Sequence, residues 1–329
     1  MVSQIPSAVA QLLIQTQCAL GESPVYAYGA LHFADLLRGV VFRWVPETNL
    51  LQQVVCRYKG AAVLLGSIGV LDQGRTNGLL VASHHGVHVV ETGVWDSPIM
   101  ELPDPLCDPL REVVEGTGED RKVVRLNDGR ASPCGRFVVG AYNSAHRQNG
   151  RAVGGVYCVD AHGNCERINA LGNVRVANGT CWDPTGTFMY FCDSPTGVLK
   201  KLRWTRTGVP DSVDQVVYDV QEHPSDADAF GGSMDGACAD DQGGIWVARM
   251  RGGCAVRHDK SSGAVTHIVR TPETVQQVAS CCVGNDTLFL TTANRGEDLT
   301  KCHGAGAVFS FQLSEFGLTA SRDEHAFSL

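Results

Sequence analysis

The chain has 329 residues, of which 43% are hydrophobic and 19% charged, and its formal net charge is −8. This balance is typical of a globular protein that buries a full core, and it excludes a disordered chain. No run of Lys or Arg accompanies the negative charge. Nucleic acid and anionic membranes are therefore poor candidate partners, because both are bound by concentrated basic patches. We expect a monomer that binds a small molecule.

The thirteen cysteines are scattered from Cys18 to Cys302 and show no CxxC spacing. An odd number at irregular spacing indicates free thiols in a reducing compartment. The N-terminal segment lacks the basic start and sustained apolar run of a secretory signal, and no stretch of about 18 apolar residues occurs. We therefore expect the protein in the cytoplasm, with the adjacent Cys281 and Cys282 buried in a strand.

A recurring unit, in which a turn leads into a short run of β-branched, aromatic or small residues, occurs six times at intervals of roughly 40 to 60 residues. The copies span residues 29–35, 78–83, 135–142, 186–193, 243–249 and 286–292. Further strand-like runs lie at 86–90, 155–159, 253–257 and 307–311. This spacing suits four-stranded propeller blades with variable loops.

Long amphipathic helical patterns are absent, and 37 glycines make turn signals dense. An all-β fold is therefore favoured over α/β, as one β-propeller domain over residues 1–329. Residues 104–121 have no strand period. We predict an inserted loop there, without a domain boundary.

Four polar clusters lie just before or within the blade-like segments, where a propeller directs loops toward its central channel. They are Leu20–Tyr26 with Glu22, Arg125–Gly129 with Asn127, Ala177–Gly186 with Asn178, and Met234–Gly243 with Asp235. Turn chemistry alone explains most of each cluster, including Asn127–Gly129, but it does not explain Arg125. The last two clusters repeat one pattern. Together the four can bring oxygen ligands from distant segments to one hard divalent cation.

The clusters resemble, in sequence and in order, the signatures of the regucalcin, gluconolactonase and luciferin-regenerating enzyme family. The matching segments are LGESPVY, RLNDGRASPCGRF, NGTCWDPTGTFMYFCDS, DGACADDQGGIWVARMRGGCAVRHD and ASCCVGNDTLFLTTA, within about residues 20–311. The resemblance implies a six-bladed propeller with one catalytic divalent cation in its channel. It places Glu22, Asn178 and Asp235 as metal ligands, Asp235 also as the acid/base residue, and Arg125 and Asn127 as contacts to substrate.

The chain departs from the family pattern at three places. Ala177 and Met234 stand where the family usually has proline, and a substrate-binding glutamate of some members has no equivalent, because residues 142–147 offer only neutral and basic groups. The substrate is therefore the least transferable part of the resemblance. The ligand types match Ca²⁺, Mg²⁺ or Mn²⁺ and tolerate Zn²⁺, so the identity of the cation stays open.

Three functions remain in view. The first is a metal-dependent lactonase that opens sugar lactones to aldonic acids, with a small-molecule lactone as its partner. The second is a related metal-dependent esterase or organophosphate hydrolase, and the third is a non-catalytic calcium-binding regulatory propeller. His84, His85 and His88 are not expected to bind a metal, because neighbours on a strand face opposite sides.

Overall fold

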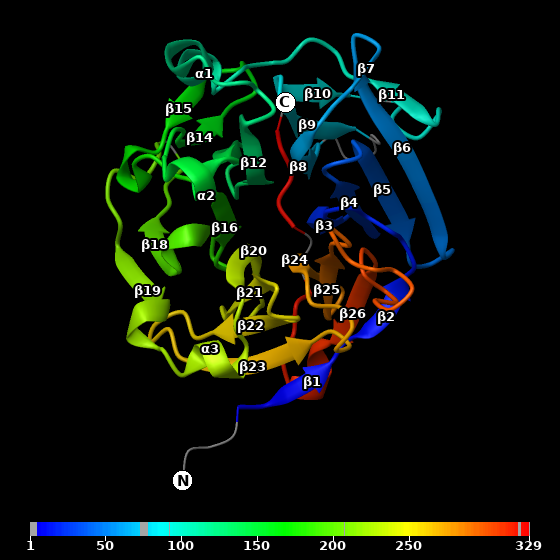
Figure 1. Cartoon of the computed structure of the whole chain (residues 1–329), viewed down its shortest axis with the longest axis vertical. Helices are drawn as coiled ribbons and strands as arrows, with labels where there is room; N and C mark the ends of the chain where they lie inside the picture. Colours follow the sequence, from blue (N-terminus) through cyan, green and yellow to red (C-terminus); the bar gives the residue numbers. More distant parts are fainter. Residues whose placement is uncertain (1–4, 73–77, 92, 207, 322–323, 329) are drawn as a thin grey trace.

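The fold is described from a computed structural model, over residues 5–72, 78–91, 93–206, 208–321 and 324–328. Within these ranges the strands form six sheets, and Figure 1 shows them as blades around a common centre. The predicted all-β, six-bladed propeller is confirmed. We number the blades 1 to 6 in chain order by their innermost strands.

The innermost strands are β3 (Gly21–Ala27), β8 (Leu65–Val70), β12 (Val124–Ala131), β16 (Ala177–Trp182), β20 (Ser233–Ala239) and β24 (Val278–Gly284). The second strands are β4 (Ala30–Asp35), β9 (Leu79–Ser83), β13 (Phe137–Asn143), β17 (Phe188–Asp193), β21 (Ile245–Met250) and β25 (Thr287–Thr292). Each of the six sequence repeats coincides with one of these second strands.

The third strands are β5 (Val40–Val45), β10 (Gly86–Val90), β14 (Val156–Val159), β18 (Val198–Arg203), β22 (Cys254–His258) and β26 (Val308–Gln312). The outer strands are β6 (Leu50–Tyr58), β15 (Cys165–Arg167), β19 (Gln215–Asp219), β23 (Val265–Arg270) and β2 (Gln11–Ile14). Three short strands add to outer edges, namely β1 (Ser7–Val9) on β23, and β7 (Ala61–Ala62) and β11 (Ile99–Glu101) on β6.

Strand β2 closes the ring, because it pairs with β26 and gives blade 6 its fourth strand. Residues near the two ends of the chain therefore share one sheet (Figure 1). Apolar side chains fill the space between neighbouring blades. Trp246 of blade 5 and Phe309 of blade 6, for example, belong to one buried cluster. Burial of such surface is the main favourable contribution to folding.

In the part of the chain that the structure describes, blade 2 consists of β8, β9 and β10, and the inserted segment supplies its outer edge. Cys107 pairs with Val87 of β10, and helix α1 (Arg111–Thr117) follows. The predicted inserted loop at residues 104–121 thus contains one backbone pairing and a short helix, and the open edge of β10 offers the backbone groups that Cys107 satisfies. Helices α2 (His146–Asn149) and α3 (Asp226–Ala229) are single turns, and no described helix is long and apolar enough to cross a membrane.

All six innermost strands contain a shift in pairing register. The shifts fall at Glu22/Val25, Leu65/Ser67, Leu126/Gly129, Asn178/Cys181, Met234/Ala237 and Val278/Ser280. Such a bulge bends the strand and changes the direction of its side chains. Neighbouring bulges lie side by side, since Gly66 approaches Leu126 and Gly236 approaches Ser280, so they turn side chains from several blades toward one part of the channel.

The end of the channel opposite the starts of the innermost strands is covered by the C-terminal segment (red in Figure 1). The backbone N–H of Glu324 donates to Tyr26 of blade 1 at 2.9 Å, and that of Phe327 donates to Val70 of blade 2 at 2.9 Å. The Phe327 side chain is buried, and the Glu324 carboxylate pairs with buried Arg130 at 2.8 Å. These contacts anchor the segment across the ring.

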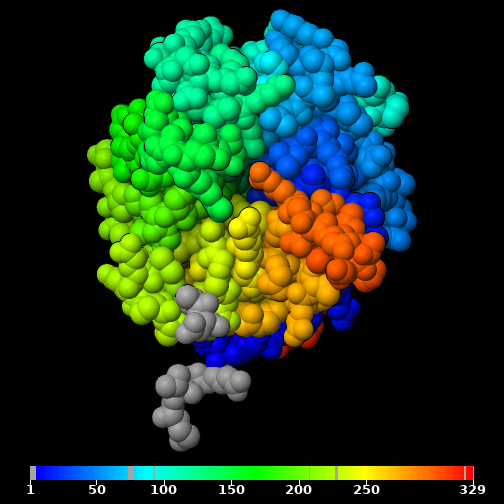
Figure 2. All heavy atoms as spheres, viewed as in Figure 1, coloured from blue at the N-terminus to red at the C-terminus, as the bar shows by residue number. Residues whose placement is uncertain are grey.

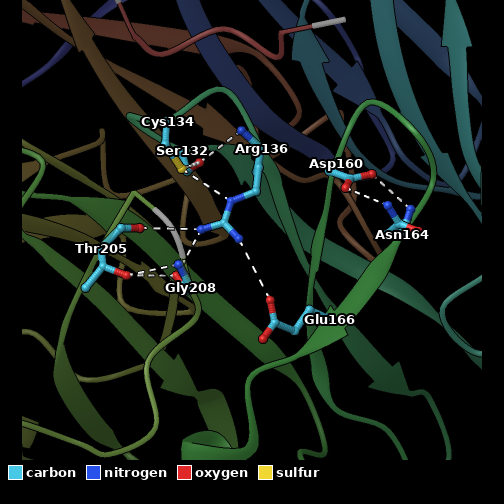
Figure 3. A network of polar contacts seen from close by, with 8 residues as sticks. All are labelled: Ser132, Cys134, Arg136, Asp160, Asn164, Glu166, Thr205 and Gly208. Carbon is cyan, nitrogen blue, oxygen red and sulfur yellow. Dashed lines mark hydrogen bonds and ion pairs between the residues drawn. The ribbon is translucent and has the colours of Figure 1, made fainter.

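Arg136, next to the β12–β13 turn, joins blade 3 to the loop that follows β18 (Figure 3). Its Nη2 donates to the Gly208 carbonyl at 2.9 Å, and its Nε donates to the Cys134 sulfur at 3.4 Å. Glu166 of β15 lies 3.9 Å from the same guanidinium. This network is a structural link at the covered end of the channel.

Replacing glycine by alanine should have opposite effects on stability at Gly66 and at Gly116, because only Gly66 lies in the close packing of the innermost strands. A Cβ at Gly66 would lie 2.6 Å from the Leu126 carbonyl oxygen, whereas a Cβ at Gly116 in α1 would meet nothing within 4 Å. Gly66→Ala should lower the free energy of unfolding by about 1–3 kcal/mol, as overpacking does. Gly116→Ala should raise it by up to about 1 kcal/mol. Urea unfolding followed by tryptophan fluorescence measures both, and equal effects of the two substitutions would contradict this packing.

Candidate functional site

The predicted site residues all lie on innermost strands, around the channel. Glu22 is on β3, Arg125 and Asn127 on β12, Asn178 on β16 and Asp235 on β20. All are buried except Asn127, which is half-buried. The sequence predicts the clusters just before or within the blade-like segments, and the structure puts all five of these residues within strands. Asn127–Gly129 forms the bulge of β12, and its Asn-Asp-Gly sequence suits a bulge as well as a turn.

Glu22 is held by the bulge of β3. The following residue, Ser23, has a positive φ of 51°, and its backbone N–H donates to the Glu22 carboxylate at 3.0 Å. The Ser23 hydroxyl in turn accepts a hydrogen bond from the backbone N–H of Ile68 in blade 2 at 2.9 Å. A strained residue persists where its surroundings fix it. Here that residue determines the direction of Glu22.

The carboxyl groups of Glu22 and Asp235 lie within hydrogen-bonding reach of each other, although their strands belong to blades 1 and 5. Burial and the neighbouring charge of Asp128 raise the pKa of Glu22 to about 8. Burial, followed by the charges of Glu22 and Asp128, raises the pKa of Asp235 well above its usual value. Two buried carboxylates in contact cannot both be charged unless a cation balances them. The pair therefore binds either a proton or a metal ion.

Asp128 is the third carboxylate of the channel and was not among the ligands implied by the sequence. It accepts a hydrogen bond from the backbone N–H of Thr180 at 2.9 Å, so it connects blade 3 to blade 4. Burial raises its pKa, while the charge of Arg130 acts in the opposite direction. Its place next to Asn127 in the sequence was the only signal that could have indicated it.

Asn127 and Asn178 are in direct contact. The amide nitrogen of Asn127 donates to the Asn178 side-chain oxygen at 3.2 Å and to the Ala177 carbonyl at 2.9 Å. The amide nitrogen of Asn178 donates to the Ser194 hydroxyl at 2.8 Å, and that hydroxyl donates to the Met234 carbonyl at 2.7 Å. Ser194 thus connects Asn178 to the residue before Asp235. No sequence motif indicated this role.

Arg125 lies on β12 two residues before Asn127. Its guanidinium stacks on the ring of Tyr142 from β13, with 4.5 Å between the guanidinium carbon and the ring centroid. Burial lowers the pKa of Arg125 to about 10, with Arg295 acting in the same direction. Arg125 therefore keeps its positive charge at neutral pH, inside the protein.

The oxygen atoms of Glu22, Asn178 and Asp235 are hard donors of the kind that Ca²⁺, Mg²⁺ and Mn²⁺ prefer. Among the described residues, no group of three or more His, Cys, Asp and Glu side chains is placed to hold a metal ion. A cation in this channel would therefore depend on the Asn178 amide as its third protein ligand. The buried pair of carboxylates fits such a cation, because its charge would relieve their mutual repulsion.

The histidines belong to the surrounding structure. His88 is buried and bonded to Ser83 at 2.9 Å and to the Pro103 carbonyl at 2.7 Å. The expectation that His84 and His85 face opposite sides of a strand was wrong, because β9 ends at Ser83 and their rings are 4.0 Å apart in the following turn.

The cysteines are free thiols, and all thirteen lie in the described residues. Cys281 and Cys282 are buried in β24, as predicted. A cavity of about 630 Å³ lies at the covered end of the channel, beside Cys134 and Glu324. None of the predicted site residues lines it, so the candidate site is the channel itself.

Comparison with known proteins relates the chain to one family. The family model described as "SMP-30/Gluconolactonase/LRE-like region" matches residues 20–294. Regucalcin of Xenopus laevis is 26% identical over 286 residues, 85% of each chain. L-arabinolactonase of Azospirillum brasilense is 32% identical over 213 residues, 60% of this chain and 63% of its own.

The fold is also similar to the folds of solved structures. The crystal structure of regucalcin from Agrobacterium tumefaciens, described as a calcium-binding protein, gives a TM-score of 0.79 with 21% identity and covers 100% of both chains. This similarity supports the fold, and the family match covers most of the sequence, including every residue of the candidate site. The chain belongs to the SMP-30/gluconolactonase/LRE-like family.

Proposed function

We propose that the chain is a lactonase that opens sugar lactones to aldonic acids with one divalent cation held by Glu22, Asn178 and Asp235. The observation that carries the proposal is the contact between Glu22 and Asp235 from different blades, beside the Asn127–Asn178 pair. The name of the Azospirillum relative, an arabinolactonase, agrees with this class of substrate.

When bound, the cation would polarise the lactone carbonyl and make a water molecule more acidic. Glu22 and Asp235 supply negative charge that balances it, and Asn178 supplies a neutral oxygen. The hydrogen bond from Asn178 to Ser194 fixes that amide. The ligands are thus oriented by the strands that carry them, before any substrate arrives.

Asp235 is the proposed acid/base residue. As a buried carboxylate beside the proposed cation, it would take a proton from the attacking water and deliver it to the ring oxygen as the ester bond breaks. Water adds across the ester, and the product is one hydroxy acid. Asn127 donates through its amide nitrogen to Ala177 and Asn178, which leaves its oxygen for a substrate hydroxyl. Arg125 provides a positive charge that orients the other end of the substrate.

Removal of divalent cations should abolish the release of acid from sugar lactones, because the buried carboxylates cannot polarise a carbonyl by themselves. Adding Mn²⁺, Mg²⁺, Ca²⁺ or Zn²⁺ to the demetallated protein should restore it. A pH-indicator assay on a panel of aldonolactones, with and without chelator, measures both steps. Full activity in the thoroughly demetallated protein would contradict this mechanism.

The same assay separates the alternative functions. An esterase or organophosphate hydrolase would turn over aryl esters or phosphotriesters included in the panel faster than any lactone. A regulatory calcium-binding propeller would bind Ca²⁺ without turning over any member of the panel.

Asp235→Asn should keep a weakened metal site, because an amide oxygen can coordinate a hard cation, but it should lose proton transfer. We expect kcat to fall about 10²–10⁴-fold, as for the loss of a general base. Initial rates at saturating metal, together with metal binding measured by calorimetry, give the two readouts.

Asp128→Asn is the matched comparison for Asp235→Asn, since it also neutralises a buried carboxylate of the channel. It should reduce kcat less. Near-normal turnover of Asp235→Asn with metal bound would transfer the acid/base role to Asp128, and the ranking of the two variants decides between them.

Arg125→Ala should raise KM, or change which lactone is preferred, and leave metal affinity nearly intact. The reason is that Arg125 contacts the proposed substrate and not the proposed metal ligands. Steady-state kinetics on several lactones, with calcium binding as the control, tests this. Loss of metal binding in Arg125→Ala would contradict the assignment.

A further inference from the structure

One end of the channel carries a buried positive charge that the protein itself does not balance. The Arg125 side chain is only 5% exposed, and in the described residues its guanidinium has no ion pair with a carboxylate. Its Nε has no hydrogen-bond partner there, and its Nη1 reaches only the adjacent Leu126 carbonyl at 3.4 Å. A buried charge without a partner is costly. The group is therefore placed to receive a partner from outside.

The other buried arginines are bonded differently. Arg130 pairs with Glu324 at 2.8 Å, and Arg257 donates from Nη2 to Asp240 at 3.0 Å. Arg249 has no carboxylate, but its Nε donates to the Gly231 carbonyl at 3.0 Å. Arg125 thus differs from Arg130 and Arg257 in having no carboxylate partner, and from Arg249 in leaving its Nε unsatisfied.

Further cations surround Arg125 at the entrance of the channel, where β9 and β25 end and β12 begins. Arg295 lies in the segment after β25, and its positive charge lowers the pKa of Arg125. Arg295 is exposed and forms no ion pair with a described carboxylate. Lys122 precedes β12, and the charges of His85, Lys122 and Arg125, after burial, lower the pKa of His84 to about 4. Arg125, Arg295 and Lys122 thus bring three positive charges to the entrance in a chain whose net charge is −8.

The carboxylates near this entrance are already engaged. Asp108 pairs with Arg121 at 2.7 Å, and Glu119 pairs with Arg151 at 2.9 Å. Glu297, two residues after Arg295, accepts hydrogen bonds from Gln277 at 2.6 Å and Cys302 at 3.4 Å. None of these carboxylates pairs with Arg125, so its guanidinium is available to a ligand. Figure 2, viewed onto this end, shows green, yellow, orange and blue segments meeting at its centre.

The spacing of Arg125 and Asn127 along β12 matches the size of a small substrate. Arg125 lies two residues before Asn127, which belongs to the bulge of β12, so their Cα atoms are at most about 7 Å apart. Asn127 contacts Asn178, so Arg125 lies one step further toward the entrance. A lactone whose carbonyl lies at Asn178 and Asp235 would extend its far end to Arg125.

We infer that the substrate is an anionic lactone, the monolactone of a sugar diacid, whose free carboxylate is bound by the guanidinium of Arg125 with Arg295 nearby. This inference rests on the proposed lactonase function and names its substrate class. Arginine suits this role, because its planar guanidinium binds a carboxylate through two parallel hydrogen bonds.

The test compares two lactones with the same ring. The 1,4-lactone of galactaric acid carries a carboxylate where the 1,4-lactone of galactonic acid carries a hydroxymethyl group. Their binding is measured by calorimetry on protein freed of metal beforehand, so that affinity is read without turnover. The protein should bind the galactaric lactone about tenfold or more tightly than the galactonic lactone, the effect of a hydrogen bond to a charged group.

Arg125→Gln should abolish this preference, and Arg295→Gln, at an exposed position where folding is not at risk, should reduce it. Arg203→Gln, on the outer part of blade 4, should leave it unchanged. Equal affinity for the two lactones, tighter binding of the galactonic lactone, no binding of either, or an unchanged preference in both Arg125→Gln and Arg295→Gln would overturn the inference.

Failure of the proposed function has a different signature. If the metal-loaded protein hydrolyses galactonic lactone but binds the two lactones equally, the lactonase proposal stands and the diacid inference falls. If it hydrolyses neither lactone nor any aldonolactone, yet binds the galactaric lactone through Arg125, the inference about the ligand stands and the catalytic proposal falls.

Discussion

Closure of the ring is the constraint on which the site depends. Glu22 in blade 1 and Asp235 in blade 5 meet across the channel, and blade 6, which β2 completes from the opposite end of the chain to β26, lies between their blades. Their bulged strands must also stand at the same level, and close approaches such as that of Gly66 to Leu126 fix that level. The site is therefore a property of the whole ring.

Charge is separated along the channel. Glu22, Asp128 and Asp235 form a buried negative region, and Arg125 with Arg295 forms a positive one at the entrance. At the covered end, Arg130 and Glu324 neutralise each other. Each unbalanced region carries a cost that folding must tolerate, as functional sites commonly do. A cation in the negative region and an anionic group in the positive region would relieve both costs. The same separation would orient a substrate, with its ester toward the carboxylates.

The repeats predicted the second strand of every blade, because a turn followed by a short apolar run is a local signal. The innermost strands were harder to recognise. Asn127–Gly129 has the composition of a turn, and only its pairing with β13 makes it a bulge. The family resemblance indicated Glu22, Asn178 and Asp235, and the structure brings them to one channel. Ser194 and the Arg130–Glu324 pair could not be predicted, because each depends on contacts between residues far apart in the sequence. The edge pairing of Cys107 has the same cause.

The central claim is that Glu22 and Asp235 form one cation site across the ring. Calorimetric titration of Ca²⁺ into the demetallated protein tests it most directly, with Glu22→Gln as the comparison, because this change removes a charge and nearly preserves the shape of the side chain. We expect one cation bound per chain, and clearly weaker binding in Glu22→Gln. Absence of binding by the unaltered chain, or equal affinity in Glu22→Gln, would contradict it.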